Sequence, residues 1–224
     1  MRMMTVSTSP YLLTKLGKMN ADLLKYFKKL GHQVCSCVWA LNTNWYMPNE
    51  KDNRFKYETE TEVICDLFPF AKRDDIATPV VYDMLKLNKP DVVISIGDYT
   101  DIGFVYAIKS LDPKSFKWIS IFTIDALPIN ENHYDLFSQV DLAIATTISG
   151  RNEIFGKTKT HDPIYIPYGP DTNIFKEPDT REETDALKII SCSKNDQATN
   201  VACLIEAIAM ANDVPSIRIG CDLH

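Results

Sequence analysis

Several features are scarce or missing in this 224-residue chain, and each absence excludes a class of protein. The six cysteines stand singly, with no C-x-x-C pair and no histidine at metal-ligand spacing, which favours buried free thiols in a reducing compartment. No apolar run reaches roughly 18 residues, so neither a membrane span nor a secretory signal is predicted. The net charge of −6 provides no sequence-wide basic field for nucleic acid. We therefore expect a cytoplasmic protein without a transmembrane segment or a nucleic-acid partner.

Catalytic signatures are also scarce. The chain has no G-x-G-x-x-G after its first strand, no G-x-S-x-G, no H-E-x-x-H and no D-x-D, and its four histidines are scattered. Residues 150–158 resemble a phosphate loop, but they have one residue too many between the glycines, and the context is reversed because a predicted helix precedes Gly156-Lys-Thr158 and a strand follows it. We expect no metal and no bound cofactor.

Lysines gather on the first predicted helix, where they lie largely opposite its apolar face: Lys15, Lys18, Lys25, Lys28 and Lys29. They form either a local basic patch or an ordinary solvated helix face. The solvated face is favoured because it is the normal outcome of helix amphipathicity.

Apolar periodicity divides residues 1–167 into alternating strands and helices. Strands are predicted at 3–7, 34–40, 62–67, 90–97, 116–122, 141–145 and 164–166, and helices at 16–30, 76–87, 103–110 and 149–155. This alternation predicts the α/β class, with a Rossmann-like, doubly wound parallel sheet covered on both faces. The first domain is therefore expected at 1–167.

Residues 41–60 are polar and aromatic, and include Trp45, Tyr46 and Tyr57. Long loops without secondary structure of their own are often functional. These aromatic side chains either form a stacking surface for a sugar or a base, or pack back on the body of the protein.

The carboxyl-terminal part of the chain predicts a second domain. Residues 168–186 are acidic and contain two prolines, which suits an exposed crossing between domains. Residues 187–224 then begin a second Rossmann-like β-α-β unit, which cannot bury both faces of a sheet alone. Either the natural chain continues, or this piece adds to the first domain or to a protein partner at the open sheet edge.

Polar residues follow several predicted strands: Asp98, Thr123 and Asp125 in the first domain, and Ser193 and Lys194 in the second. Taken singly, each is typical of a helix cap or a turn. Taken together, they would face one cleft at the carboxyl ends of the strands, where such folds bind ligands.

The order of motifs resembles the GT-B glycosyltransferases of family 4. The motifs that carry this resemblance are Ser9–Gly17 before the first helix, Gly31-His-Gln-Val34, Pro90–Ile94, Phe122–Pro128, Asp141–Thr147, Ile166–Phe175, and Leu187–Asn200 ahead of Leu204–Ala207. The version at 166–175, Ile-Pro-Tyr-Gly-Pro-Asp-Thr-Asn-Ile-Phe, is similar to the interdomain signature of that family. The resemblance covers nearly the whole chain.

The resemblance implies transfer of a sugar from a nucleotide-sugar donor, such as a UDP- or GDP-sugar, to an acceptor, with retention and without a required metal. The roles that it implies are donor-phosphate binding by Gly17, Ser193 and Lys194, acceptor binding by Asp98 and Thr123, and a catalytic position at Asp125. Lys194 stands where the family has an arginine. The family's glutamate pair for the donor would lie beyond His224, so the chain is expected to be an incomplete part of the enzyme and inactive alone.

Two other functions stay open. A non-catalytic scaffold that kept the fold after losing its donor site would act with a protein partner. A nucleotide-sugar epimerase would use the same fold, because fold alone does not fix function. The sequence does not name the sugar, the nucleotide or the acceptor.

Overall fold

The computed structural model describes residues 1–39, 55–70, 74–124, 126–158 and 162–169, together with Thr172, Lys176, Glu206, Ala207 and Met210. The chain divides into two units, Met1–Gly169 and Pro170–His224. Nearly all the described residues belong to the first unit. The predicted strand at 187–192 and the candidate residues Asp125, Ser193 and Lys194 lie outside the described residues.

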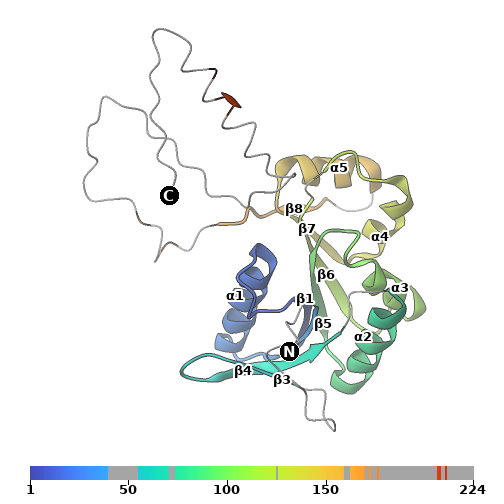
Figure 1. The fold of residues 1–224 in the computed structure, drawn as a ribbon. Coiled ribbons are helices and arrows are strands. Elements are labelled where there is room, and N and C mark those ends of the chain that lie inside the picture. The colour runs from blue at the N-terminus through green and yellow to red at the C-terminus, as the bar shows by residue number, and fades with distance from the viewer. Residues whose placement is uncertain are drawn as a thin grey trace. The chain divides into compact units, whose positions relative to one another are not determined.

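The first unit is an α/β structure with an eight-stranded sheet (Figure 1). Its strands are β1 (Arg2–Thr8), β2 (Gln33–Trp39), β3 (Phe55–Glu58), β4 (Val63–Pro69), β5 (Val92–Gly97), β6 (Lys117–Phe122), β7 (Leu142–Ala145) and β8 (Ile164–Tyr165). Its helices are α1 (Lys15–Lys29), α2 (Asp74–Asn88), α3 (Gly103–Leu111), the short 3-10 turn η2 (Glu131–His133), α4 (Tyr134–Gln139) and α5 (Ile148–Thr158).

The strand order is β3-β4-β2-β1-β5-β6-β7-β8. Strand β1 pairs in parallel with β2 on one side and with β5 on the other, so Met4 lies opposite both Cys35 and Val93. The chain therefore extends the sheet first to one side of β1 and then to the other. This confirms the predicted Rossmann-like, doubly wound sheet.

One strand departs from the parallel arrangement. Strand β3 pairs antiparallel with β4, although the sequence predicted a loop at 41–60. Within β3, Phe55 and Tyr57 are buried while Lys56 and Glu58 are exposed, which is the alternation of an edge strand with one covered face. Tyr57 thus packs back on the protein, and Trp45 and Tyr46 lie outside the described residues.

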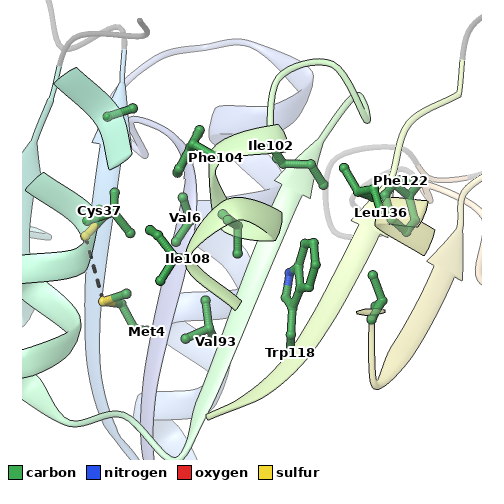
Figure 2. Packing of buried hydrophobic residues seen from close by; sticks show 14 of the residues in the cluster. Met4, Val6, Cys37, Val93, Ile102, Phe104, Ile108, Trp118, Phe122 and Leu136 are labelled. Carbon is green, nitrogen blue, oxygen red and sulfur yellow. Dashed lines mark hydrogen bonds between the residues drawn. The ribbon is translucent and has the colours of Figure 1, made fainter. Parts of the chain in front are cut away.

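Helices α2 to α5 lie on one face of the sheet and enclose the larger hydrophobic core (Figure 1). Figure 2 shows this core from close by, with Phe104 and Ile108 of α3 facing the strands and Trp118 of β6 among the buried side chains. Helix α4 was not predicted, because its six residues are too few to show a helical period. Trp118 is fully buried, and its indole N–H donates to Ser95 Oγ at 2.8 Å, so its polar group is satisfied.

Helix α1 covers the opposite face, over β1, β2 and β4. Leu24 is fully buried there against Val38 and Leu67. Among the described residues, α1 is the one helix on this face, and the predicted cover by helices stays a prediction for β6 and β7. Helices α2 to α5 lie on the other face because each belongs to a right-handed crossover that runs in the same direction across the sheet.

Candidate functional site

The loops that follow β1, β5, β6 and β7 meet at one edge of the sheet, because parallel strands end on the same side. The strand order reverses between β1 and β5. In open α/β sheets, ligands bind outside the carboxyl ends of the strands at such a reversal. This carboxyl edge is the first candidate site.

Asp98 lies at this edge, directly after β5. Its Oδ1 accepts hydrogen bonds from the backbone N–H of Thr100 at 2.9 Å and from the Thr100 hydroxyl at 2.8 Å. The carbonyl of Asp98 accepts from the N–H of Asp101 at 2.9 Å. These are the contacts of a turn residue that shapes the loop before α3. An acceptor-binding role for Asp98 stays a prediction.

Thr123 lies beside Asp98. Its backbone N–H donates to the carbonyl of Gly97 at 3.1 Å, and only 5% of the residue is exposed. The structure therefore brings together two of the three candidates in the first domain. The third, Asp125, falls outside the described residues.

Gly17 lies in the first turn of α1, where the loop after β1 folds back on the helix. A Cβ at this position would stand 2.3 Å from the Leu12 carbonyl oxygen and 2.7 Å from that of Ser9. The Gly17 N–H donates to the hydroxyl of Thr14, the helix cap, at 3.1 Å. The close approach of the loop therefore explains this glycine without a ligand, and its role toward donor phosphates stays a prediction.

The sequence did not reveal an aromatic pair at the same edge. The ring of Tyr99, in the loop after β5, stands edge-on to the imidazole of His133 in η2, with centroids 4.9 Å apart. Tyr99 also contacts Phe137, with centroids 6.1 Å apart. Tyr99 and His133 are 34 positions apart, so no local sequence pattern could have joined them.

A second candidate site is an apolar groove of about 560 Å³ between α1 and the part of the sheet that no described helix covers on that side. It is lined by Met19, Asp22, Leu23, Tyr26, Phe27, Ile94, Ile119, Ile121, Leu142, Ile144, Thr146, Ile166, Pro167, Tyr168 and Gly169. The sequence carried a signal for this groove, namely the apolar side chains that alternate with the core residues of β6 and β7. That signal was assigned to burial beneath a helix.

Three of the five lysines of α1 have contacts with other residues of the chain. Lys18 pairs with Asp22 at 3.0 Å, Lys28 donates to the carbonyl of Ile64 at 3.1 Å, and Lys15 lies 5.9 Å from the ring centroid of Tyr168. These contacts fit a structural, solvated helix face better than a patch for a polyanion.

Three cysteines are described, and none of them is in a disulfide. Burial, with the nearby Asp66 carboxylate, raises the pKa of Cys35 to about 12, so the thiol stays neutral at physiological pH.

Within the described part of the chain, no three His, Cys, Asp or Glu side chains are grouped as metal ligands. Across the same residues, every helix is too short or too polar to traverse a bilayer. The phosphate-loop-like stretch at 150–158 belongs to α5.

The chain matches no known protein family and no curated protein sequence. Among solved structures, the chain is similar to an alpha-glucosyltransferase in complex with UDP and a 13-mer DNA containing a central A:G mismatch. The sequence identity is 13% and the TM-score is 0.42, and the alignment covers 68% of this chain and 39% of that one. It is also similar to an alpha-glucosyltransferase in complex with UDP, with 11% identity and a TM-score of 0.44, over 75% of this chain and 43% of that one. Sure protein from Aquifex aeolicus aligns with 16% identity and a TM-score of 0.29, and the alignment covers 60% of this chain and 56% of that one. The chain thus spans about two fifths of the two glucosyltransferase structures, and at these identities the likeness concerns the fold alone.

Proposed function

We propose that this protein is part of a glycosyltransferase that moves a sugar from a nucleotide-sugar donor to an acceptor hydroxyl, with retention and without a metal ion. The observation that carries the proposal is the carboxyl edge of the sheet beside the strand reversal. Thr123 lies next to Asp98 there, because the Thr123 N–H donates a hydrogen bond to the carbonyl of Gly97, the residue before Asp98. The order of sequence motifs along the chain supports the same assignment.

In this transfer, the bond between the anomeric carbon and the diphosphate oxygen breaks, and a bond from that carbon to the acceptor oxygen forms. The acceptor hydroxyl gives its proton to the departing diphosphate oxygen, which leaves with the electron pair of the broken bond. Asp98, whose carboxylate lies at the edge, would accept a hydrogen bond from the acceptor. Lys194 would act as a point charge beside the departing diphosphate, and Asp125 would lie beside the reacting sugar.

Thermal unfolding in the presence of UDP, GDP and their sugar conjugates tests the donor assignment. A ligand at a hundredfold its dissociation constant stabilises the folded state by about 2.7 kcal/mol. For a chain of this length that amounts to a rise in Tm of about 5–11 °C. One nucleotide should produce this shift, and Lys194→Ala should remove most of it.

A matched control is Lys114→Ala, which removes a lysine from the loop after α3, outside both candidate sites. It should leave the nucleotide shift unchanged. If none of the nucleotides raises the Tm of the full-length protein, the transferase proposal fails.

A non-catalytic scaffold is the second candidate. Its specific support is that Gly17 and Asp98 both have structural partners that account for them without a ligand. Asp98→Asn distinguishes the two candidates: it should lower the transfer rate at least tenfold in an enzyme, and should leave partner binding unchanged in a scaffold.

A further inference from the structure

Among the residues that the structure describes, no helix lies over β6 and β7 on the α1 side, whereas parallel sheets are normally covered on both sides. On β6, Trp118 and Phe122 point into the helix-covered core, and the intervening Ile119 and Ile121 line the groove and remain partly exposed. On β7, Leu142 and Ile144 continue the same surface. Within the described part of the chain this floor is aliphatic and only partly buried, so a bound apolar group would gain the free energy of removing these side chains from water.

The groove has the size of a small-molecule site. Its volume of about 560 Å³ falls within the range of roughly 300–1,000 Å³ found for such sites. Along α1 it runs from Met19 to Phe27, which is about 12 Å at 1.5 Å per residue. Across the floor it spans β5 to β7, or about 10 Å at the usual strand spacing.

These dimensions are too small for a stable protein partner. A stable protein–protein interface buries about 800 Å² of accessible surface on each partner, and a groove of about 12 Å by 10 Å can supply only part of such an area. A protein that used this groove would therefore need most of its contact area elsewhere.

The chemistry of the lining restricts the ligand. No lysine or arginine lines the groove, and its one carboxylate, Asp22, is paired with Lys18 at 3.0 Å. A carbohydrate or a nucleic acid would lose water from its hydroxyl or phosphate groups without gaining partners from the aliphatic floor, at a cost of roughly 1–3 kcal/mol for each unpaired polar group.

Polar groups occur at the carboxyl end of the groove. The Thr146 hydroxyl donates to the Phe122 carbonyl at 3.3 Å, which leaves its oxygen able to accept a hydrogen bond. Tyr168, 42% exposed, adds a phenol group at the same end. A ligand with an apolar body and one hydroxyl group would thus place its hydroxyl near the carboxyl edge, where Thr123 and Asp98 lie.

We propose that this groove binds an apolar small molecule that carries one hydroxyl group, and that this alcohol is the acceptor of the sugar. The second part rests on the proposed glycosyl transfer, and the first part does not. The apolar body lies between α1 and β5–β7, and the hydroxyl points to the end marked by Thr146.

The test is binding of the fluorescent alcohol 1-pyrenebutanol to the full chain, with n-decanol and maltose as competitors. Binding should be saturable with one site, and n-decanol should displace the probe while maltose should not. Ile121→Trp fills the floor of the groove and Ile144→Asn makes it polar, so each should weaken binding at least tenfold. Leu111→Asn changes an apolar residue that is 73% exposed on α3, and should leave binding unchanged.

A photoreactive diazirine alcohol on the wild-type protein gives a second measurement that does not depend on the folding of variants. Its adducts should map to groove residues such as Met19, Ile121 and Tyr168. Adducts elsewhere, absence of saturable binding, or equal affinity in the groove variants would each overturn the proposal. A wild-type dimer that Ile144→Asn converts to a monomer would overturn it too, since the groove would then belong to an interface between copies.

The nucleotide titration on the same samples separates the two proposals. Alcohol binding without any nucleotide response would refute the transferase and leave the groove site standing. A nucleotide response without alcohol binding would refute the acceptor class and leave the transferase standing.

Discussion

Asp141 lies directly before β7 and accepts hydrogen bonds from three donors at the amino-terminal edge of the sheet. Its oxygens receive Lys117 Nζ at 2.8 Å and the backbone N–H of Trp118 at 2.8 Å. Lys109 Nζ lies 3.3 Å away, and the Lys109 side chain is only 5% exposed. Asp141→Asn keeps the shape of the side chain and removes the negative charge, so it tests what the carboxylate contributes to stability.

The expected cost follows from the burial of Lys109. Removing one partner of a buried ion pair typically costs 3–5 kcal/mol, because an uncompensated charge is left behind. Asp141 is 28% exposed and water will partly solvate the site, so we expect about 2–3 kcal/mol. That loss corresponds to a fall in Tm of about 4–12 °C for a protein of this size.

Urea denaturation at pH 7 measures this loss, and a double mutant shows its cause. Lys109→Met removes the buried ammonium, so adding it to Asp141→Asn should restore part of the lost stability. The control is Asp22→Asn, which breaks the exposed pair with Lys18 and should change the free energy of unfolding by no more than about 0.5 kcal/mol.

The effect of Asp141 should also depend on pH. Burial acts to raise the pKa of this carboxyl, but the hydrogen bonds from Lys117 and from the Trp118 N–H, with the charge of Lys109, outweigh burial and hold the pKa below its ordinary value. A lowered folded-state pKa contributes stability that is complete above the unfolded pKa of about 3.9 and disappears as the pH falls through the folded value. The difference between wild type and Asp141→Asn should therefore shrink below about pH 4. A difference at pH 7 below 0.5 kcal/mol, or one that Lys109→Met leaves unchanged, would refute the reasoning.

Two further predictions concern the local packing. Gly17→Ala should lower the free energy of unfolding by roughly 1–3 kcal/mol, because the new Cβ would collide with the carbonyl oxygens of Leu12 and Ser9. An unchanged free energy of unfolding in urea denaturation would contradict this and show that the loop moves to make room for the methyl group. Burial raises the pKa of Cys35 and of Cys65 to about 12, so both thiols should react slowly with a disulfide reagent at pH 8 and rapidly after unfolding in urea. Fast reaction of either thiol in the folded protein would contradict its burial.

Most of the secondary structure was predictable because its signals are local. The helix predicted at 16–30 is α1, and the strand predicted at 90–97 contains β5. In both, the apolar spacing matches the period of the element, and Gly31, with a φ of 80°, ends α1 as its position predicted.

The elements that were missed depend on contacts distant in the sequence. Strand β3 has four residues, too few for a clear period, and it is held by β4 and by the Tyr11 hydroxyl, which donates to the Lys56 carbonyl at 2.8 Å and accepts from the Glu58 N–H at 3.0 Å. The pair of Tyr99 and His133 depends in the same way on the return of the chain after β6.

The sequence by itself determined the α/β class, because strands and helices follow from apolar repeats of two to four residues. It also determined which polar residues follow the strands, because turn residues mark the strand ends. Only the tertiary structure decided that Gly17 meets its own loop and that Thr123 lies beside Asp98. Within the described residues, it also decided that isoleucines of β6 and β7 expected beneath a helix line a groove beside α1. The physical reason is that the face on which a crossover helix packs is set by the handedness of the connection and the order of the strands, which no local pattern encodes.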